Sequence, residues 1–198
     1  MTTCNMVFAG VGGQGILLAA EIVGTAAAKA GYNVRVSEIH GMAQRGGAVV
    51  SYVRIGEKIL APTVLEGSAD IIVGFEPMEA LRNIKFASQE TTILVNIHPF
   101  KVSGTEYPDV GDILKSASNF TQSIVPVDAK ALAEKAGSEV TLNVVMVGAL
   151  AATGKLPIKA QVLKEALCEL VPAKYLDMNM RAFELGCQAI DALAQHSK

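Results

Sequence analysis

The sequence predicts an α/β fold: three layers, α/β/α, around a mostly parallel, Rossmann-like sheet, with a helical C-terminal third. Three observations support this prediction. Short apolar runs alternate with helical patterns through most of the chain. The chain begins with the pattern of a strand, a glycine-rich turn and a helix, and its last part has helical patterns only. The length of 198 residues fits one domain, 1–198, with a helical region at about 142–198 packed on it.

The chain opens with a predicted βαβ unit. Residues 5–9 form an apolar strand, residues 14–30 have the apolar spacing of a helix, and Gly31 ends that helix. A second strand from Val34 to Glu38 completes the unit within about 35 residues, the usual scale of this motif. The inner face of the helix is expected to consist of four apolar residues: Leu17, Leu18, Ile22 and Ala26.

Short strands and turns follow this unit. The expected elements are a strand at 48–55, a turn at 56–58 into an antiparallel strand at 59–60, a buried strand at 69–75, a helix that begins at Pro77, a buried strand at 92–96 and an extended connection over 99–111.

The rest of the chain is predicted to be mainly helical. Asp128 and Gly137 are suitable residues to begin and end one of these helices. The expected elements are a helix at 112–118, a strand at 123–127, and helices at 129–136, 142–152, 159–170 and 175–195.

The composition argues against several classes of function. The net charge is −2 and no basic patch with interleaved aromatic residues is present, so no nucleic-acid partner is expected. The longest apolar run, residues 144–152, is far shorter than the ~18 residues of a membrane span. The start of the chain lacks a signal-peptide pattern, which favours a cytoplasmic location.

The chain is also unusually apolar. Hydrophobic residues make up 51% of it and charged residues only 18%, against a typical charged share of about 25%. We therefore expect a stable oligomer or hetero-complex in which another subunit covers apolar surface. Cys4, Cys168 and Cys187 lie far apart, and so do the three histidines. This spacing predicts free thiols in a reducing compartment and no metal site.

The first candidate binding motif is the turn after the first strand. Gly10, Gly12 and Gly15 satisfy the pattern G-x-G-x-x-G, with an additional glycine at Gly13, and a strand precedes them while a helix follows. Backbone N–H groups in such a turn can hold a phosphate at the start of the helix. Gln14 could donate to a ligand oxygen or cap the helix. The alternative for the whole motif is a tight turn that serves packing alone.

The second candidate motif follows the second strand. A guanidinium pairs well with a phosphate or carboxylate, and flanking glycines allow close approach of a ligand. Glu38, at the strand end, could hold a ribose as in dinucleotide-binding folds, or be a solvated charge. The alternative for Arg45 is a structural role, in which it bridges to an acid such as Glu38. The candidate ligand-binding residues are Glu38, Gln44, Arg45, Gly46 and Gly47, and His40 is the candidate catalytic residue.

Several polar residues elsewhere are weaker candidates. Glu76, Asn96 and His98 follow strand ends on the expected ligand edge of the sheet, and Asn143 and Asn179 lie in C-terminal helices. For each of them, a helix cap or an internal hydrogen bond is favoured over contact with a ligand.

The two motifs together resemble the small (gamma- or beta-type) subunits of 2-oxoacid:ferredoxin oxidoreductases. The resemblance includes Gly10–Gly15 and Ser37–Gly47, and the His-Gly-Met-Ala-Gln sequence before Arg45 favours the indolepyruvate branch. It extends in order over nearly the whole chain. The further matching segments are Gly74–Pro77 with Glu79–Leu81, Asn143 with Gly148–Leu150, and Asn179 with Ala182, Phe183 and Gly186.

The resemblance implies a fold like the third domain of pyruvate:ferredoxin oxidoreductase and a subunit that holds no cluster. The complex would decarboxylate a 2-oxoacid, with an aryl pyruvate such as indolepyruvate favoured, on thiamine diphosphate. It would pass two electrons through 4Fe–4S clusters to ferredoxin and transfer the acyl group to coenzyme A. Thiamine diphosphate and the clusters would belong to a large partner subunit. This chain would form a wall at the coenzyme A site and could form a homodimer when isolated.

Two other functions fit the same residues. One is a stand-alone NAD(P)-dependent oxidoreductase that uses the glycine turn, Glu38 for the ribose and His40 as acid and base. The other is a non-catalytic module that binds a nucleotide or coenzyme A.

Overall fold

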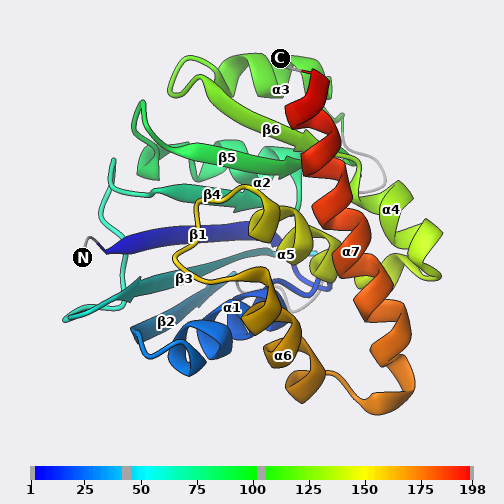
Figure 1. Ribbon diagram of the computed structural model, residues 1–198. Coiled ribbons are helices and arrows are strands. Elements are labelled where there is room, and N and C mark those ends of the chain that lie inside the picture. Colours follow the sequence, from blue (N-terminus) through cyan, green and yellow to red (C-terminus); the bar gives the residue numbers. More distant parts are fainter. Residues whose placement is uncertain (1–2, 42–45, 102–105, 197–198) are drawn as a thin grey trace.

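The computed structural model describes residues 3–41, 46–101 and 106–196, in which a six-stranded sheet lies between two layers of helices (Figure 1). The strand order is β2-β3-β1-β4-β5-β6. This arrangement confirms the predicted α/β fold and its mostly parallel sheet. The strands are β1 (Cys4–Val11), β2 (Asn33–His40), β3 (Ala48–Gly56), β4 (Ile71–Gly74), β5 (Thr92–Asn96) and β6 (Ser123–Val127).

Strand direction brings most of the carboxyl ends to one edge of the sheet. β1, β4, β5 and β6 are parallel, and β3 is antiparallel to both β1 and β2, so that β2 runs in the same direction as β1. The predicted hairpin from 56–58 into 59–60 is wrong, because residues 59–60 form no strand. Both edges of β3 are already hydrogen-bonded to β1 and β2, so a hairpin partner has no edge to join.

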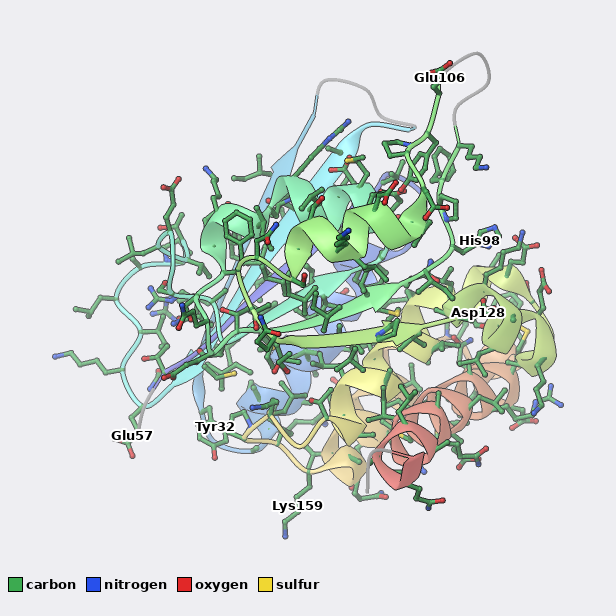
Figure 2. All side chains as sticks on the ribbon, turned by 90° about the horizontal axis from the view of Figure 1, so that it is seen from above. Tyr32, Glu57, His98, Glu106, Asp128 and Lys159 are labelled. Atoms are coloured by element: carbon green, nitrogen blue, oxygen red, sulfur yellow. The ribbon has the colours of Figure 1, made fainter. Side chains whose placement is uncertain are left out.

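Helices cover the two faces unequally. α2 and α3 lie on one face, and the larger group of helices lies on the other (Figure 2). Two short 3₁₀ turns, η1 (Ile84–Phe86) and η2 (Glu139–Thr141), complete the fold. The helices are α1 (Ile16–Lys29), α2 (Pro77–Arg82), α3 (Val110–Ala117), α4 (Ala129–Ala136), α5 (Leu142–Ala152), α6 (Ala160–Leu170) and α7 (Ala173–His196).

The sheet-facing side of α1 differs in part from the prediction. Ile22 and Ala26 are fully buried as expected, but Leu17 is 37% exposed and Leu18 is only partly buried. Helix α1 instead buries mainly small residues against the sheet, including Ala19 and Ala20. Small residues let a helix approach a sheet closely, which leaves the two leucines to the side of that contact.

The C-terminal helices form the layer that the sequence predicts. Helix α5 is buried from Asn143 to Leu150, and α7 crosses it at close range. Asp128 caps α4 by accepting a hydrogen bond from the Ala131 N–H at 3.1 Å. Within the described residues, no helix combines the length and apolar character needed to cross a bilayer.

The three thiols differ in environment, and this difference predicts their order of alkylation. Burial raises the pKa of Cys4 to about 12 and the pKa of Cys187 to about 11, whereas Cys168 is exposed. Because the thiolate is the reactive form, iodoacetamide at about pH 8 is expected to label Cys168 first. Mass spectrometry of peptides over a time course measures this order. Equal labelling rates of the three thiols would contradict the described burial.

Candidate functional site

The glycine turn joins the end of β1 to the start of α1. Gly13 and Gly15 have φ angles of 104° and 73°, a region that side chains other than glycine rarely adopt. Gly15 also lies against Asn143, because a Cβ at Gly15 would be 2.5 Å from the Asn143 Nδ2 atom. Backbone conformation therefore favours glycine at both positions, and close packing on α5 adds a second requirement at Gly15.

Hydrogen bonds within the protein use some N–H groups of the turn. The Val11 N–H donates to Gln14 Oε1 at 2.7 Å, and the Gln14 N–H donates to the Val11 carbonyl at 3.1 Å. The N–H groups of Gly13 and Gly15, in contrast, make no hydrogen bond to the described part of the chain. With the unpaired first-turn N–H groups of α1, they form a partially positive surface that suits an anion.

A buried carbonyl connects three strand ends beneath this turn. The Phe75 carbonyl, after β4, accepts hydrogen bonds from Gln14 Nε2 at 3.2 Å and from Asn96 Nδ2 at 3.0 Å. Asn96 is fully buried at the end of β5. Its Oδ1 atom accepts from the N–H groups of His98 and Ala129, each at 3.2 Å. Asn96 therefore fixes the segment after β5 and the start of α4 relative to the glycine turn.

A pocket of 320 Å³ opens between these elements, and we call it the glycine-turn pocket. Lys130 of α4 brings an ammonium group to it, 3.3 Å from the Glu139 carboxylate and 3.9 Å from the Glu134 carboxylate. His98 lies at this edge of the molecule, near Asp128 (Figure 2). The lining residues are Gly12, Gly13, Gln14, Asn96, His98, Pro99, Phe100, Lys130, Glu139, Val140 and Leu142.

A buried carboxylate holds the loop beside this pocket. Glu76 is 1% exposed and caps α2, because its Oε2 atom accepts from the Glu79 N–H at 2.9 Å. Its Oε1 atom accepts from the Phe100 N–H at 3.2 Å and from the Tyr107 hydroxyl. Burial, and then the bond to Glu76, raise the pKa of Tyr107. Glu76 thus holds residues on both sides of the segment 101–106.

The second candidate motif lies next to the first where the structure describes it. The Gly12 N–H donates to the Gly47 carbonyl at 2.8 Å, and Gly46 lines a neighbouring pocket of 380 Å³ with Glu76 and Tyr107. Gln44 and Arg45 lie outside the described residues, so their binding role stays a prediction.

The two remaining residues of this motif belong to β2. His40 is its last residue, and its side chain also lies outside the description. Glu38 lies on β2 opposite Ser51 and does not line the glycine-turn pocket. The catalytic role of His40 and the ribose-binding role of Glu38 therefore stay predictions.

Two residues at this edge were not found from the sequence. Lys130 is the second residue of α4, the helix that follows β6. Its position just after the carboxyl end of a strand could have identified it as a candidate ligand-binding residue. Tyr107 gave no such signal, because a polar loop far from Glu76 in sequence brings it to the site. Asn143 forms internal hydrogen bonds, as expected, at 2.9 Å to the Val144 N–H and 3.3 Å to the Gly15 carbonyl.

Comparison with known proteins gives consistent matches over the chain. The family model described as pyruvate ferredoxin/flavodoxin oxidoreductase matches residues 5–189. The indolepyruvate oxidoreductase subunit IorB of Thermococcus kodakarensis is 46% identical over 195 residues, and that of Pyrococcus horikoshii is 45% identical, each covering 96% of both chains. The keto/oxoacid ferredoxin oxidoreductase gamma subunit of Geobacter sulfurreducens has a similar fold, with a TM-score of 0.70 and 24% identity over 96% of this chain and 99% of that one.

Proposed function

We propose, from the premise that the chain belongs to the pyruvate ferredoxin/flavodoxin oxidoreductase family, that its glycine-turn pocket binds the phosphates of coenzyme A in an assembled complex. The chain is a small subunit of a 2-oxoacid:ferredoxin oxidoreductase. Its relatives named for indolepyruvate support an aryl pyruvate as the 2-oxoacid. The reaction would transfer the acyl group from the 2-oxoacid anion to the sulfur of coenzyme A and release carbon dioxide, two electrons and the thiol proton.

The redox cofactors are assigned to a large partner subunit. A 4Fe–4S cluster is usually held by four cysteines, and this chain contains three, of which Cys168 is exposed and the others lie in separate elements. The described residues contain no cluster of three histidine, cysteine or acidic side chains that could hold a metal ion. These residues do not fit a cluster, so the partner would supply both the clusters and thiamine diphosphate, and ferredoxin would accept electrons from that partner.

The observation that supports a phosphate site is the set of donors at one pocket. Gly13 lines the pocket, and its N–H group makes no hydrogen bond to the described residues. The N–H group of Gly15, which also lacks a partner in the described part of the chain, and the N-terminus of α1 follow it in the sequence, and Lys130 contributes a cation to the pocket. A phosphate group can accept several such hydrogen bonds at once. Glu139 already pairs with Lys130, so a bound phosphate would share that ammonium group or displace the exposed carboxylate.

Substitution of Lys130 tests this site. Lys130→Ala in the purified complex is expected to weaken coenzyme A binding about tenfold, because one charge-assisted contact with a phosphate is lost. Binding of pantetheine, which has no phosphate, should not change. Isothermal titration calorimetry measures both affinities, and Arg45→Ala is titrated in the same series.

The matched control is Lys135→Ala, which removes an exposed lysine from the last turn of the same helix. Its affinity for coenzyme A should equal that of the unmodified complex. If Lys130→Ala also leaves coenzyme A binding unchanged, Lys130 does not contact the phosphates. If both Lys130→Ala and Arg45→Ala leave it unchanged, the phosphate site lies elsewhere.

A further inference from the structure

A second cavity adjoins the glycine-turn pocket. It has a volume of 450 Å³, within the range of about 300–1,000 Å³ typical of small-molecule sites. The start of α1, the η2–α5 segment and the corner between α6 and α7 form its walls. We call it the α6–α7 slot. Gly13 lines both cavities, and so does Val140.

The walls of the slot are mostly apolar, and an aromatic ring lies at its rim. Leu18 and Met178 contribute to the walls, while Tyr175 is 45% exposed and Val140 is 83% exposed. The Lys174 ammonium lies 4.6 Å from the centroid of the Tyr175 ring. An exposed aromatic ring beside an apolar cavity provides a surface on which a flat ligand can stack.

One polar atom in the slot lacks a hydrogen-bond partner among the described residues. Asn179 is 8% exposed, and its Nδ2 atom donates to the Tyr175 carbonyl at 2.9 Å, which identifies Oδ1 as the other amide atom. Oδ1 makes no hydrogen bond to the described residues. This acceptor is still open to solvent, because Ser51 Oγ is the buried side-chain atom that lacks a partner within the described residues. A ligand N–H donor can therefore take the place of water at Oδ1.

The slot is joined rigidly to the glycine turn. Asn143 lines the slot and donates from Nδ2 to the Gly15 carbonyl at 3.3 Å, while its Oδ1 accepts from the Val144 N–H at 2.9 Å. Gly15 leaves no space for a Cβ beside Asn143. A ligand that binds in the slot would therefore lie at a fixed position relative to the N–H groups of Gly13 and Gly15.

We propose that the α6–α7 slot binds a flat heteroaromatic ring that carries an N–H donor. The ring stacks on Tyr175 and donates a hydrogen bond to Asn179 Oδ1. The identity of the ring rests on the proposed function. That function offers two sources: the adenine of coenzyme A and the indole group of an aryl 2-oxoacid. All residues assigned to the slot belong to this chain, so the chain alone should bind the ring.

Phosphate-free rings test the slot directly. Adenosine and indole-3-propionate are each titrated into the full-length chain by isothermal titration calorimetry. Because the chain contains no tryptophan, the emission of the indole ligand also reports its binding. At least one of the two rings is expected to bind with a Kd below about 1 mM. Tighter binding of adenosine identifies the coenzyme as the source, and tighter binding of the indole identifies the 2-oxoacid.

Two variants assign the contacts. Tyr175→Ala and Asn179→Leu are each expected to weaken the bound ring about tenfold. Phe120→Ala is the matched control, because Phe120 is 44% exposed and follows α3 on the opposite face of the sheet. Circular dichroism confirms that each variant is folded. Failure of both rings to bind below about 1 mM, or unchanged affinity in either variant, would overturn the proposal.

Pyrophosphate separates this inference from the proposed phosphate site. It has no ring, so its binding to the same chain reports on the glycine turn alone. Ring binding without pyrophosphate binding would support the slot and count against the phosphate site. Pyrophosphate binding without ring binding would support the phosphate site and overturn the slot.

Discussion

Replacement of Gly148 by alanine is expected to lower the free energy of unfolding by more than about 3 kcal/mol. A Cβ at Gly148 in α5 would lie 2.0 Å from the Phe183 carbonyl oxygen in α7, and one at Gly186 in α7 would lie 2.1 Å from the Val145 carbonyl oxygen. Both obstacles are backbone atoms, so no side chain can move aside to make space. Alanine would force the two helices apart and open gaps in a close-packed core.

The loss should appear although alanine favours helices over glycine by about 1 kcal/mol. Gly24→Ala in α1 is the matched control, because its Cβ would meet only side-chain atoms of β2, with the nearest, Val36 Cγ2, at 3.2 Å. Urea unfolding followed by circular dichroism measures the free energy of each variant. Equal stability of Gly148→Ala and Gly24→Ala would show that α5 and α7 are not in backbone contact.

Local patterns in the sequence were sufficient for most elements. The strands at 92–96 and 123–127 and the helix at 129–136 have the predicted bounds, because turn residues or a capping Asp128 enclose each apolar run. The hairpin at 59–60 was wrong because the partners of β3 are β1 and β2, and strand pairing between distant segments leaves no local signal.

The candidate site was less accessible from the sequence. The glycine turn was identified because strand, turn and helix are consecutive. Its contact with Gly47 arises because β3 is antiparallel to β1, a pairing that the sequence analysis did not predict. The pairing of Gly148 with α7, and the approach of Lys130 and Tyr107 to the strand ends, depend on tertiary packing. An internal hydrogen bond was expected for Asn96. Its position below the pocket, where it bonds to the Phe75 carbonyl, could not be derived from the sequence of its own strand.

Asn96→Ala is expected to be the most disruptive polar substitution at the site, with a loss of about 2–4 kcal/mol in the free energy of unfolding. The alanine leaves the N–H groups of His98 and Ala129 without their acceptor, and the Phe75 carbonyl with only the bond from Gln14. Each buried group without a partner costs about 1–3 kcal/mol, although water that enters the space can satisfy part of this demand.

The same substitution should also affect the pocket. Asn96 accepts from the N–H group of His98 and from that of Ala129, the residue before Lys130. The placement of His98 and Lys130 at the pocket therefore depends on the Asn96 side chain. We expect Asn96→Ala to weaken pyrophosphate binding as well as stability, whereas Asn119→Ala, at an exposed asparagine after α3, should change neither. Urea unfolding and calorimetric titration measure the two effects. Wild-type stability of Asn96→Ala would mean that the three strand ends are held together by the apolar core alone.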